Sequence, residues 1–170
     1  MTLERILLPV RGDDDERIDR LIEAVVDVAS SAETTVTIAH VIPNRNEWIS
    51  SSMLATPGSN FPQTFSESEY DELLDQHSLE EENLDDVVAN QETVQTLADR
   101  LEEAGIGYEI RGAVGEPGEA LVSMAGELNV DRVIVGGRHR SPTDKILFGS
   151  VAQTLLLEAP CPVTLIRDNV

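Results

Sequence analysis

The sequence predicts an α/β domain built on a mostly parallel sheet that helices cover on both faces. Three observations predict it. Short apolar or β-branched runs, typical of buried strands, alternate with segments of helical periodicity along the chain. The alternation begins and ends with a strand, which suits right-handed crossover connections. The length of 170 residues suits one domain around a single core.

The first part of the chain predicts two strands around one helix. Residues 5–10, RILLPV, form a short apolar run, and the acidic residues that follow suit the positive end of a helix. Residues 18–29 place apolar side chains at three- and four-residue steps, which predicts an amphipathic helix. Residues 34–42 are rich in β-branched side chains and predict a second strand, which Pro43 ends.

Residues 43–76 predict an irregular insertion within the single domain that spans residues 1–170. The segment has no clean period and is rich in turn-forming residues. Four of the aromatic side chains of the protein nevertheless lie in it: Trp48, Phe61, Phe65 and Tyr70. Two interpretations remain open. The insertion docks on the domain or on a second subunit, or it is a mobile loop with scattered apolar residues.

The second part of the chain continues the alternation of helices and strands. The expected elements are a helix at 84–104, a strand at 107–114, a helix at 117–128, a strand at 131–137, a helix at 149–158 and a strand at 161–167. Gly105 supplies a C-terminal stop for the first of these helices. Pro117 is tolerated in the first turn of the second helix.

The charge of the chain is strongly acidic, with a formal net charge of −20. Dense carboxylates repel one another in dilute buffer and are tolerated when concentrated salt screens them, so the composition predicts a salt-adapted surface. An acidic face that binds a partner is the alternative. Nucleic acid is a poor partner for such a surface, because its recognition relies on clustered basic residues.

The sequence also indicates the compartment of the protein. No apolar run long enough to span a membrane occurs, and the N-terminus lacks the pattern of a signal peptide, so we expect a soluble cytoplasmic protein with no membrane partner. Cys161 is the only cysteine, which excludes an intramolecular disulfide and a Cys-based metal site within one chain. We expect it to pack as a small apolar residue at the start of a strand.

The stretch GGRHRSPTDKILFGSVA, residues 136–152, predicts an anion-binding loop. Gly136 and Gly137 permit close approach of the backbone and unusual dihedral angles directly after a strand. Gly149 and Ser150 open a helix, whose free N–H groups and positive dipole end favour an anion. Arg138, Arg140 and Lys145 add positive charge in the same loop. In an open parallel sheet, this loop and the turn after the first strand flank the ligand crevice.

The spacing of this loop resembles that of the universal stress protein family. Nucleotide-binding members of the family carry a Gly, two residues, a second Gly, nine residues, and then Gly with Ser or Thr. In this chain, Gly136 matches the first Gly, and Gly149 with Ser150 match the last pair. The similarity extends to ILLPV near the N-terminus, to GEPGEALVSMAGELNVDRVIVGGR and to FGSVAQTLLLEAPCPVTLIR.

The resemblance implies a fold and a partner. The fold is a three-layer sandwich, like that of the adenine nucleotide alpha hydrolases, around a five-stranded parallel sheet of order 3-2-1-4-5 with helices on both sides. The partner is a second copy of the chain, in a homodimer joined through the last strand, residues 162–167. The ligand that the resemblance implies is ATP with Mg²⁺, or a related nucleotide.

Two positions depart from the pattern of the nucleotide-binding members. His139 occupies the place of the second Gly, and Arg11 occupies the place of an Asp that contacts the adenosine moiety. Val41 matches the residue at a strand end that backs the adenine, and it suits the core equally well. The implied nucleotide site consists of Arg11, Val41, Gly136, Gly137, His139, Arg140, Lys145, Gly149 and Ser150.

Two functions therefore remain open: a binding or regulatory module of the stress response that binds a nucleotide, and a dimeric interaction protein of the same fold that binds none. An enzyme is the least favoured class. Ser150 has no base evident in the sequence, and no motif of a nucleophile elbow, a zinc protease or a P-loop is present. His40 suits the crevice or a structural role at the end of a strand, and His77 has no neighbours that suggest a metal site.

Overall fold

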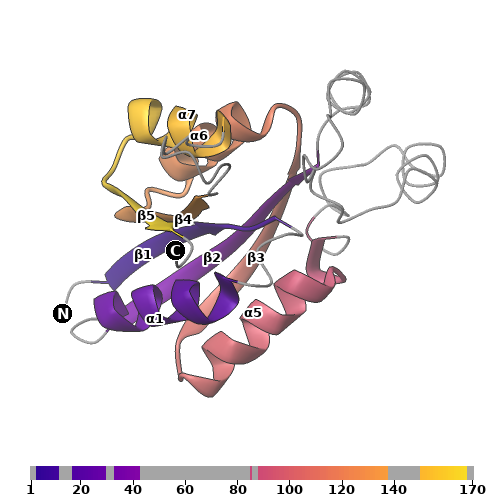
Figure 1. Cartoon of the computed structure of the whole chain (residues 1–170), viewed down its shortest axis with the longest axis vertical. Coiled ribbons are helices and arrows are strands. Elements are labelled where there is room, and N and C mark those ends of the chain that lie inside the picture. The colour runs from indigo at the N-terminus through magenta and orange to yellow at the C-terminus, as the bar shows by residue number, and fades with distance from the viewer. Residues whose placement is uncertain are drawn as a thin grey trace, which may run out of the picture.

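Five parallel strands form one sheet in the order β3-β2-β1-β4-β5 (Figure 1). The strands are β1 (Leu3–Pro9), β2 (Glu33–Ile42), β3 (Gly107–Val114), β4 (Arg132–Gly137) and β5 (Val163–Arg167). The computed structural model describes residues 3–11, 17–29, 33–42, 85, 88–137 and 150–167. The observed order confirms the sheet that the resemblance implied.

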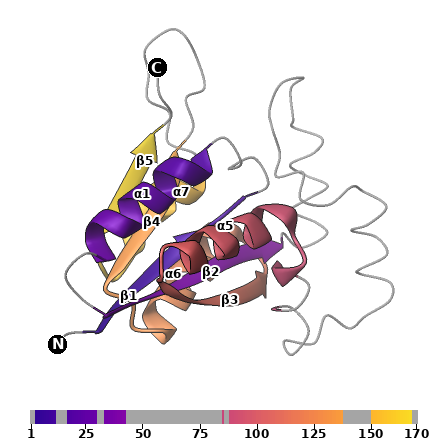
Figure 2. The same ribbon diagram turned by 90° about the horizontal axis from the view of Figure 1, so that it is seen from below.

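Helices cover both faces of the sheet, as the alternating pattern predicted. They are α1 (Ile18–Ala29), α5 (Glu92–Glu103), α6 (Pro117–Glu127) and α7 (Ser150–Glu158). Helices α1 and α5 lie on one face, and α6 and α7 lie on the other, so the molecule has three layers (Figures 1 and 2). β1 lies at the centre of the sheet. Ile6 and Leu8 pack in the core under α1 and α5, and Leu7 packs in the core under α6 and α7.

The prediction of one helix over residues 84–104 is wrong. The helical segment is interrupted at Asn90 and Gln91, and Gln91 has an extended backbone with φ −70° and ψ 135°. Val88 and Val94 explain the break, because both side chains are buried in the same core cluster. Six positions on a continuous α-helix would place them on different sides of the helix. The interruption therefore lets both valines reach the core.

The predicted stop at Gly105 is confirmed. Gly105 has a φ of +72°, and its N–H donates to the Glu102 carbonyl at 3.0 Å. The Ile106 N–H donates to the Leu101 carbonyl at 3.0 Å, which completes a Schellman cap of α5. Asn129 ends α6 in the same way, with a φ of 49°. These caps satisfy carbonyls that the helix ends leave without helical partners.

Helices α6 and α7 approach each other closely at Gly118. A Cβ atom at this position would lie 2.8 Å from the Thr154 Cβ. Glu116 begins α6, and its carboxylate accepts hydrogen bonds from the N–H groups of Gly118 at 3.2 Å and Glu119 at 2.6 Å. The contact requires glycine at 118, so it fixes how closely the two helices pack against each other.

Cys161 lies just before β5 and packs against the core under α6 and α7, as the sequence predicted. Burial raises the pKa of its thiol, the Asp131 carboxylate raises it further, and Arg132 opposes the shift. The segment at 43–76, with its aromatic residues, lies outside the described residues. Across the described ranges, each helix is too short or too polar to cross a bilayer.

Candidate functional site

The carboxyl ends of β2, β1 and β4 lie next to one another at one edge of the sheet. The chain runs from β1 to β2 on one side, while β4 flanks β1 on the other side. This is the point where the strand order reverses, at which open parallel sheets bind their ligands. Val41, Arg11 and Gly136 come from these three neighbouring strand ends. Part of the predicted site is therefore brought together by the topology.

Arg11 directly follows β1 and reaches toward β4. Its Nη2 donates a hydrogen bond to the carbonyl of Gly136, with the two atoms 3.4 Å apart. The preceding residue keeps β1 in register, because the Val10 N–H donates to the Ala39 carbonyl at 2.9 Å. The Arg11 side chain is half-buried. A positive charge thus stands between the ends of β1 and β4.

Gly136 and Gly137 are regular residues of β4, paired with Ile166 and Arg167 of β5. Neither glycine has a positive φ, so β4 does not use the conformational freedom that glycine permits here. Packing explains glycine at 137, because a Cβ there would lie 2.9 Å from Cδ1 of Leu165. The strand therefore continues without distortion to the edge of the sheet.

Ser150 is the first described residue of α7, one position after the expected helix start at Gly149, which lies outside the described residues. Its side chain is exposed, and its carbonyl accepts a hydrogen bond from Thr154 Oγ1 at 2.9 Å. The N–H groups of a first helical turn favour an anion. The remaining predicted site residues, His139, Arg140, Lys145 and Gly149, lie outside the described residues.

Val41 lies near the end of β2 and is 7% exposed. It pairs with Ala113 of β3 and belongs to the core cluster under α6 and α7. Its position next to β1 suits contact with a flat apolar group at the edge of the sheet. Its burial equally suits the core role that the sequence left open.

His40 has a structural role in the described part of the chain. The side chain is 3% exposed, and Nδ1 lies 2.9 Å from the Val10 carbonyl. Since a carbonyl only accepts, we assign the proton to Nδ1. Burial lowers the pKa of His40, and the hydrogen bond to Val10 acts in the opposite direction. The imidazole therefore holds the end of β2 against the end of β1 in its neutral form.

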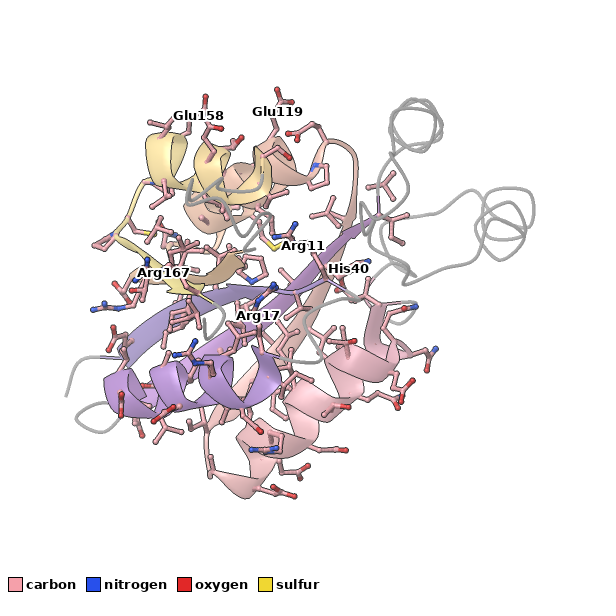
Figure 3. The ribbon with its side chains drawn as sticks, viewed as in Figure 1. Arg11, Arg17, His40, Glu119, Glu158 and Arg167 are labelled. Atoms are coloured by element: carbon pink, nitrogen blue, oxygen red, sulfur yellow. The ribbon has the colours of Figure 1, made fainter. Side chains whose placement is uncertain are left out.

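Arg17 is a buried residue that sequence reasoning missed. Its side chain is 6% exposed although it stands one residue before α1, next to an acidic run that indicates a solvated turn. A signal was present: Arg17 precedes Leu21 by four positions and Val25 by eight, which places it on the buried face of α1. Figure 3 shows Arg11, Arg17 and His40 grouped around the end of β1.

The site is electrostatically unlike the rest of the chain. Arg11 brings a guanidinium group to this edge of the sheet in a protein whose net charge is −20. Such a local reversal of charge suits an anionic ligand. Within the described ranges, His, Cys, Asp and Glu side chains form no group that would hold a metal ion.

Comparison with known proteins identifies relatives across the chain. The model of the universal stress protein family matches residues 2–167. A universal stress protein of Mycolicibacterium smegmatis is 38% identical over 77 residues, which cover 45% of this chain and 59% of the relative. The next two curated relatives are matched over only 32% and 36% of their lengths.

Solved structures show the same fold. A universal stress protein from Archaeoglobus fulgidus in complex with dAMP has a TM-score of 0.59 at 19% identity, with 98% of this chain and 99% of that chain covered. A universal stress family protein from Arabidopsis thaliana with AMP bound has a TM-score of 0.54 at 13% identity, with 98% and 93% covered. At these identities the likeness shows the fold.

Proposed function

Because the chain belongs to the universal stress protein family, we propose that it is a binding and regulatory module of the stress response that holds an adenine nucleotide. The observation that carries the proposal is the meeting of Arg11, Val41 and Gly136 at the point where strand order reverses. The proteins of the same fold that hold dAMP and AMP support this choice of ligand. We place the module in the cytoplasm.

The proposed nucleotide spans the carboxyl edge of the sheet. Its phosphates bind at the first turn of α7, where Gly149 and Ser150 supply N–H groups and a hydroxyl. Arg140 and Lys145 neutralise the phosphate charge, and Mg²⁺ accompanies ATP through its phosphate oxygens. A charged ligand of this kind gains most from cationic side chains that the edge holds in place.

The other end of the ligand lies over the ends of β2 and β1. The base packs against Val41, and the Arg11 guanidinium faces the ribose. Arg11 and His139 are the two side chains that shape this site differently from the nucleotide-binding pattern. We propose binding without turnover, since the sequence carries no recognised nucleophile or metal motif.

Calorimetric titration with AMP, dAMP and ATP with Mg²⁺ in molar KCl tests the proposal. We expect saturable binding with a dissociation constant of about 1 mM or below. Arg11→Asp and His139→Gly, which restore the pattern of the nucleotide-binding members, should each tighten binding. Arg100→Asp on α5 is the control, because it makes the same change of charge away from the site. The absence of heat at millimolar nucleotide in the wild type and in both variants would rule the proposal out.

A nucleotide turnover assay separates binding from catalysis. We expect no phosphate release above the rate in buffer. Turnover that disappears in Ser150→Ala or Lys145→Ala would overturn the non-catalytic assignment and identify an enzyme of this site.

A second candidate function is a dimeric interaction protein that binds no nucleotide. The hydrogen bond from Arg11 to the Gly136 carbonyl favours it, because the guanidinium itself ties β1 to β4 at the place where a nucleotide would lie. Under this alternative, Arg11→Asp loses a structural contact and gains no affinity for a nucleotide. The titration above therefore distinguishes the two functions.

We further propose that the chain forms a homodimer through β5. This strand lies at the end of the sheet order and pairs with β4 alone among the described strands. Its residues before Arg167 carry no charge, whereas exposed strand edges are commonly protected by charged side chains. Leu157 on the preceding helix is 76% exposed, which adds apolar surface near the same end of the chain.

Sedimentation of the wild type and of Thr164→Lys tests the dimer. The lysine places a charge at the second residue of β5, and we expect it to weaken dimerisation by tenfold or more, about 1.4 kcal/mol. Gln95→Lys on the exposed side of α5 is the matched control. A wild type that sediments as a monomer at micromolar concentration would contradict this proposal, as would a dimer that both variants leave unchanged.

A further inference from the structure

A hollow with a volume of about 290 Å³ opens on the face of the sheet that carries α6 and α7. Its lining residues are Arg5, Thr35, Thr37, Glu109, Leu128 and Val130. The first four come from the amino-terminal halves of β1, β2 and β3, and the last two come from the connection between α6 and β4. The nucleotide site proposed above lies at the opposite ends of the strands, so the hollow is a separate feature.

The hollow is a consequence of the strand order. Helix α6 ends at Glu127, and the chain turns at Asn129 into β4, which lies on the far side of β1 from β2. In the first halves of β2 and β3 on this face, Thr35 is half-buried and Glu109 is exposed, whereas Thr37 is buried. On the other face, α1 and α5 pack against the sheet (Figure 2). An open polar surface remains where the sheet extends beyond α6.

The charged groups of the hollow are held by hydrogen bonds to the protein. Nη1 of Arg5 donates to the carbonyl of Leu128 at 3.1 Å, which fixes the guanidinium against one wall. No carboxylate of the described residues forms an ion pair with it. Oε1 of Glu109 accepts a hydrogen bond from Thr37 Oγ1 at 3.0 Å, which draws the carboxylate from β3 over β2. Oε2 of the same carboxylate lies 3.8 Å from Nη2 of Arg111 in an exposed ion pair. The two opposite charges therefore stand on two sides of one cavity.

The remaining lining groups complete a dipolar site. Thr35 lies on the floor, and its hydroxyl makes no hydrogen bond to another described residue. Leu128 and Val130 supply an aliphatic wall. Arg5 pairs with Thr35 of β2, and Glu109 pairs with Thr37, so the two residues are two strands apart with an offset of two positions, about 12 Å across the sheet. The reach of both side chains leaves room for a molecule of a few non-hydrogen atoms.

We propose that this hollow binds a small aliphatic zwitterion of the amino-acid class. Its carboxylate pairs with the Arg5 guanidinium, its ammonium pairs with Glu109, and its aliphatic part lies on Leu128. A zwitterion offers an opposite charge to both groups, whereas a simple anion meets only Arg5 and a simple cation meets only Glu109, which already pairs with Arg111. A ligand with no net charge also avoids the repulsion that a protein of net charge −20 exerts on anions.

Calorimetry and saturation-transfer NMR with glycine, β-alanine and valine test this inference. We expect saturable binding at millimolar concentration. Acetate and methylammonium, which each carry only one of the two charges, should bind at least about tenfold more weakly. Acetate that binds as tightly as the amino acids would identify an anion site at Arg5 and overturn the proposal. Methylammonium that does so would identify a cation site at Glu109, with the same consequence.

Three variants locate the binding site. Arg5→Gln and Glu109→Gln each remove one proposed charge contact, and Thr35→Val removes the hydroxyl group from the lining of the hollow; all three positions are exposed or partly exposed. Each should raise the dissociation constant, the two charge variants by about tenfold or more. Glu102→Gln is the control, because it removes one charge from the exposed side of α5, on the other face of the sheet. This variant should change the dissociation constant less than twofold.

Thermal unfolding midpoints within a few degrees of the wild type would confirm that the variants fold. A fourth variant, Val130→Ala, tests the aliphatic wall, because it should weaken the binding of valine more than the binding of glycine. The absence of saturable binding at tens of millimolar amino acid contradicts the inference, and so does binding that all variants retain. The inference does not depend on nucleotide binding, since none of the substituted residues lies at the carboxyl edge of the sheet.

Discussion

His40 is an ionisable side chain that the fold keeps neutral. Burial lowers its folded-state pKa below the unfolded value of about 6.5. Between these two values the unfolded chain binds a proton that the folded protein does not bind. The contribution of neutral His40 to stability is therefore complete above about pH 6.5 and is lost as the pH falls from there toward the folded pKa.

We expect the free energy of unfolding of the wild type to fall more steeply between pH 7.5 and pH 5.5 than that of His40→Asn. The difference in slope is at most about 1.4 kcal/mol for each pH unit. Urea unfolding at several pH values measures it, and the many carboxylates cancel in the comparison because both proteins carry them. If the free energies of unfolding of the wild type and of His40→Asn depend on pH in the same way, the fold does not protect the His40 side chain from protonation.

The residue scale also shows what a sequence conveys about a site. Arg11 and Gly136 follow strands, and the carboxyl ends of neighbouring parallel strands meet at one edge, so their proximity was predictable. Arg17 was not singled out, because a charged residue in an acidic run is expected to be exposed to solvent. Its burial depends on how α1 lies against the sheet, and only the three-dimensional packing determines that.

At the scale of elements, the contact between α6 and α7 gives a matched pair of glycines in one helix. Gly118 faces Thr154, whereas a Cβ on Gly126 would meet no atom within 4 Å. Gly118→Ala should therefore destabilise the protein by about 1–3 kcal/mol through overpacking. Gly126→Ala should stabilise it by about 0.5–1 kcal/mol, because alanine loses less backbone entropy in a helix.

Chemical denaturation of both alanine variants measures this difference. The pair controls for helix propensity, since both substitutions introduce the same residue into α6. Equal stabilisation by the two substitutions would mean that α6 and α7 are further apart than the contact at Thr154 requires.

The elements themselves were predictable wherever a local pattern reports burial. The five strands and the helices α1, α6 and α7 appear within a few residues of their expected ranges. They were predictable because the spacing of apolar residues along each element matches the face that the element buries. The expected helix at 84–104 failed for a tertiary reason. Asp85 accepts a hydrogen bond from the Gly112 N–H at 2.7 Å and lies 3.6 Å from Arg111, so β3 holds the segment that precedes the break. No local pattern contains that contact.

At the scale of the whole molecule, the acidic surface should make stability depend on salt. Glu119 on α6 and Glu158 on α7 point away from the sheet into solvent (Figure 3). The described ion pairs lie at exposed or half-exposed positions, where such pairs contribute little. Repulsion between carboxylates therefore outweighs local attraction at low ionic strength, with a net charge of −20.

We expect the free energy of unfolding to rise by about 1–3 kcal/mol between roughly 0.1 M and 2 M KCl, as screening shortens the range of repulsion. Denaturation by urea at each salt concentration measures the change, since urea carries no charge. Sucrose at equal osmolality is the control for the exclusion of solutes from the protein surface. A similar rise in sucrose, or no rise in KCl, would exclude a salt-adapted surface.

The central position of β1 has a consequence for how the protein is made. β1 is synthesised first, yet its edge toward β4 is closed by residues near the far end of the chain, and the Asp131 carboxylate accepts a hydrogen bond from the Arg5 N–H across 126 positions. A nascent chain on the ribosome therefore presents an apolar strand with one open edge until β4 has emerged. Chaperones that shield such edges should act on this protein during translation. The nascent chain should no longer need them once the last third of the chain has been synthesised.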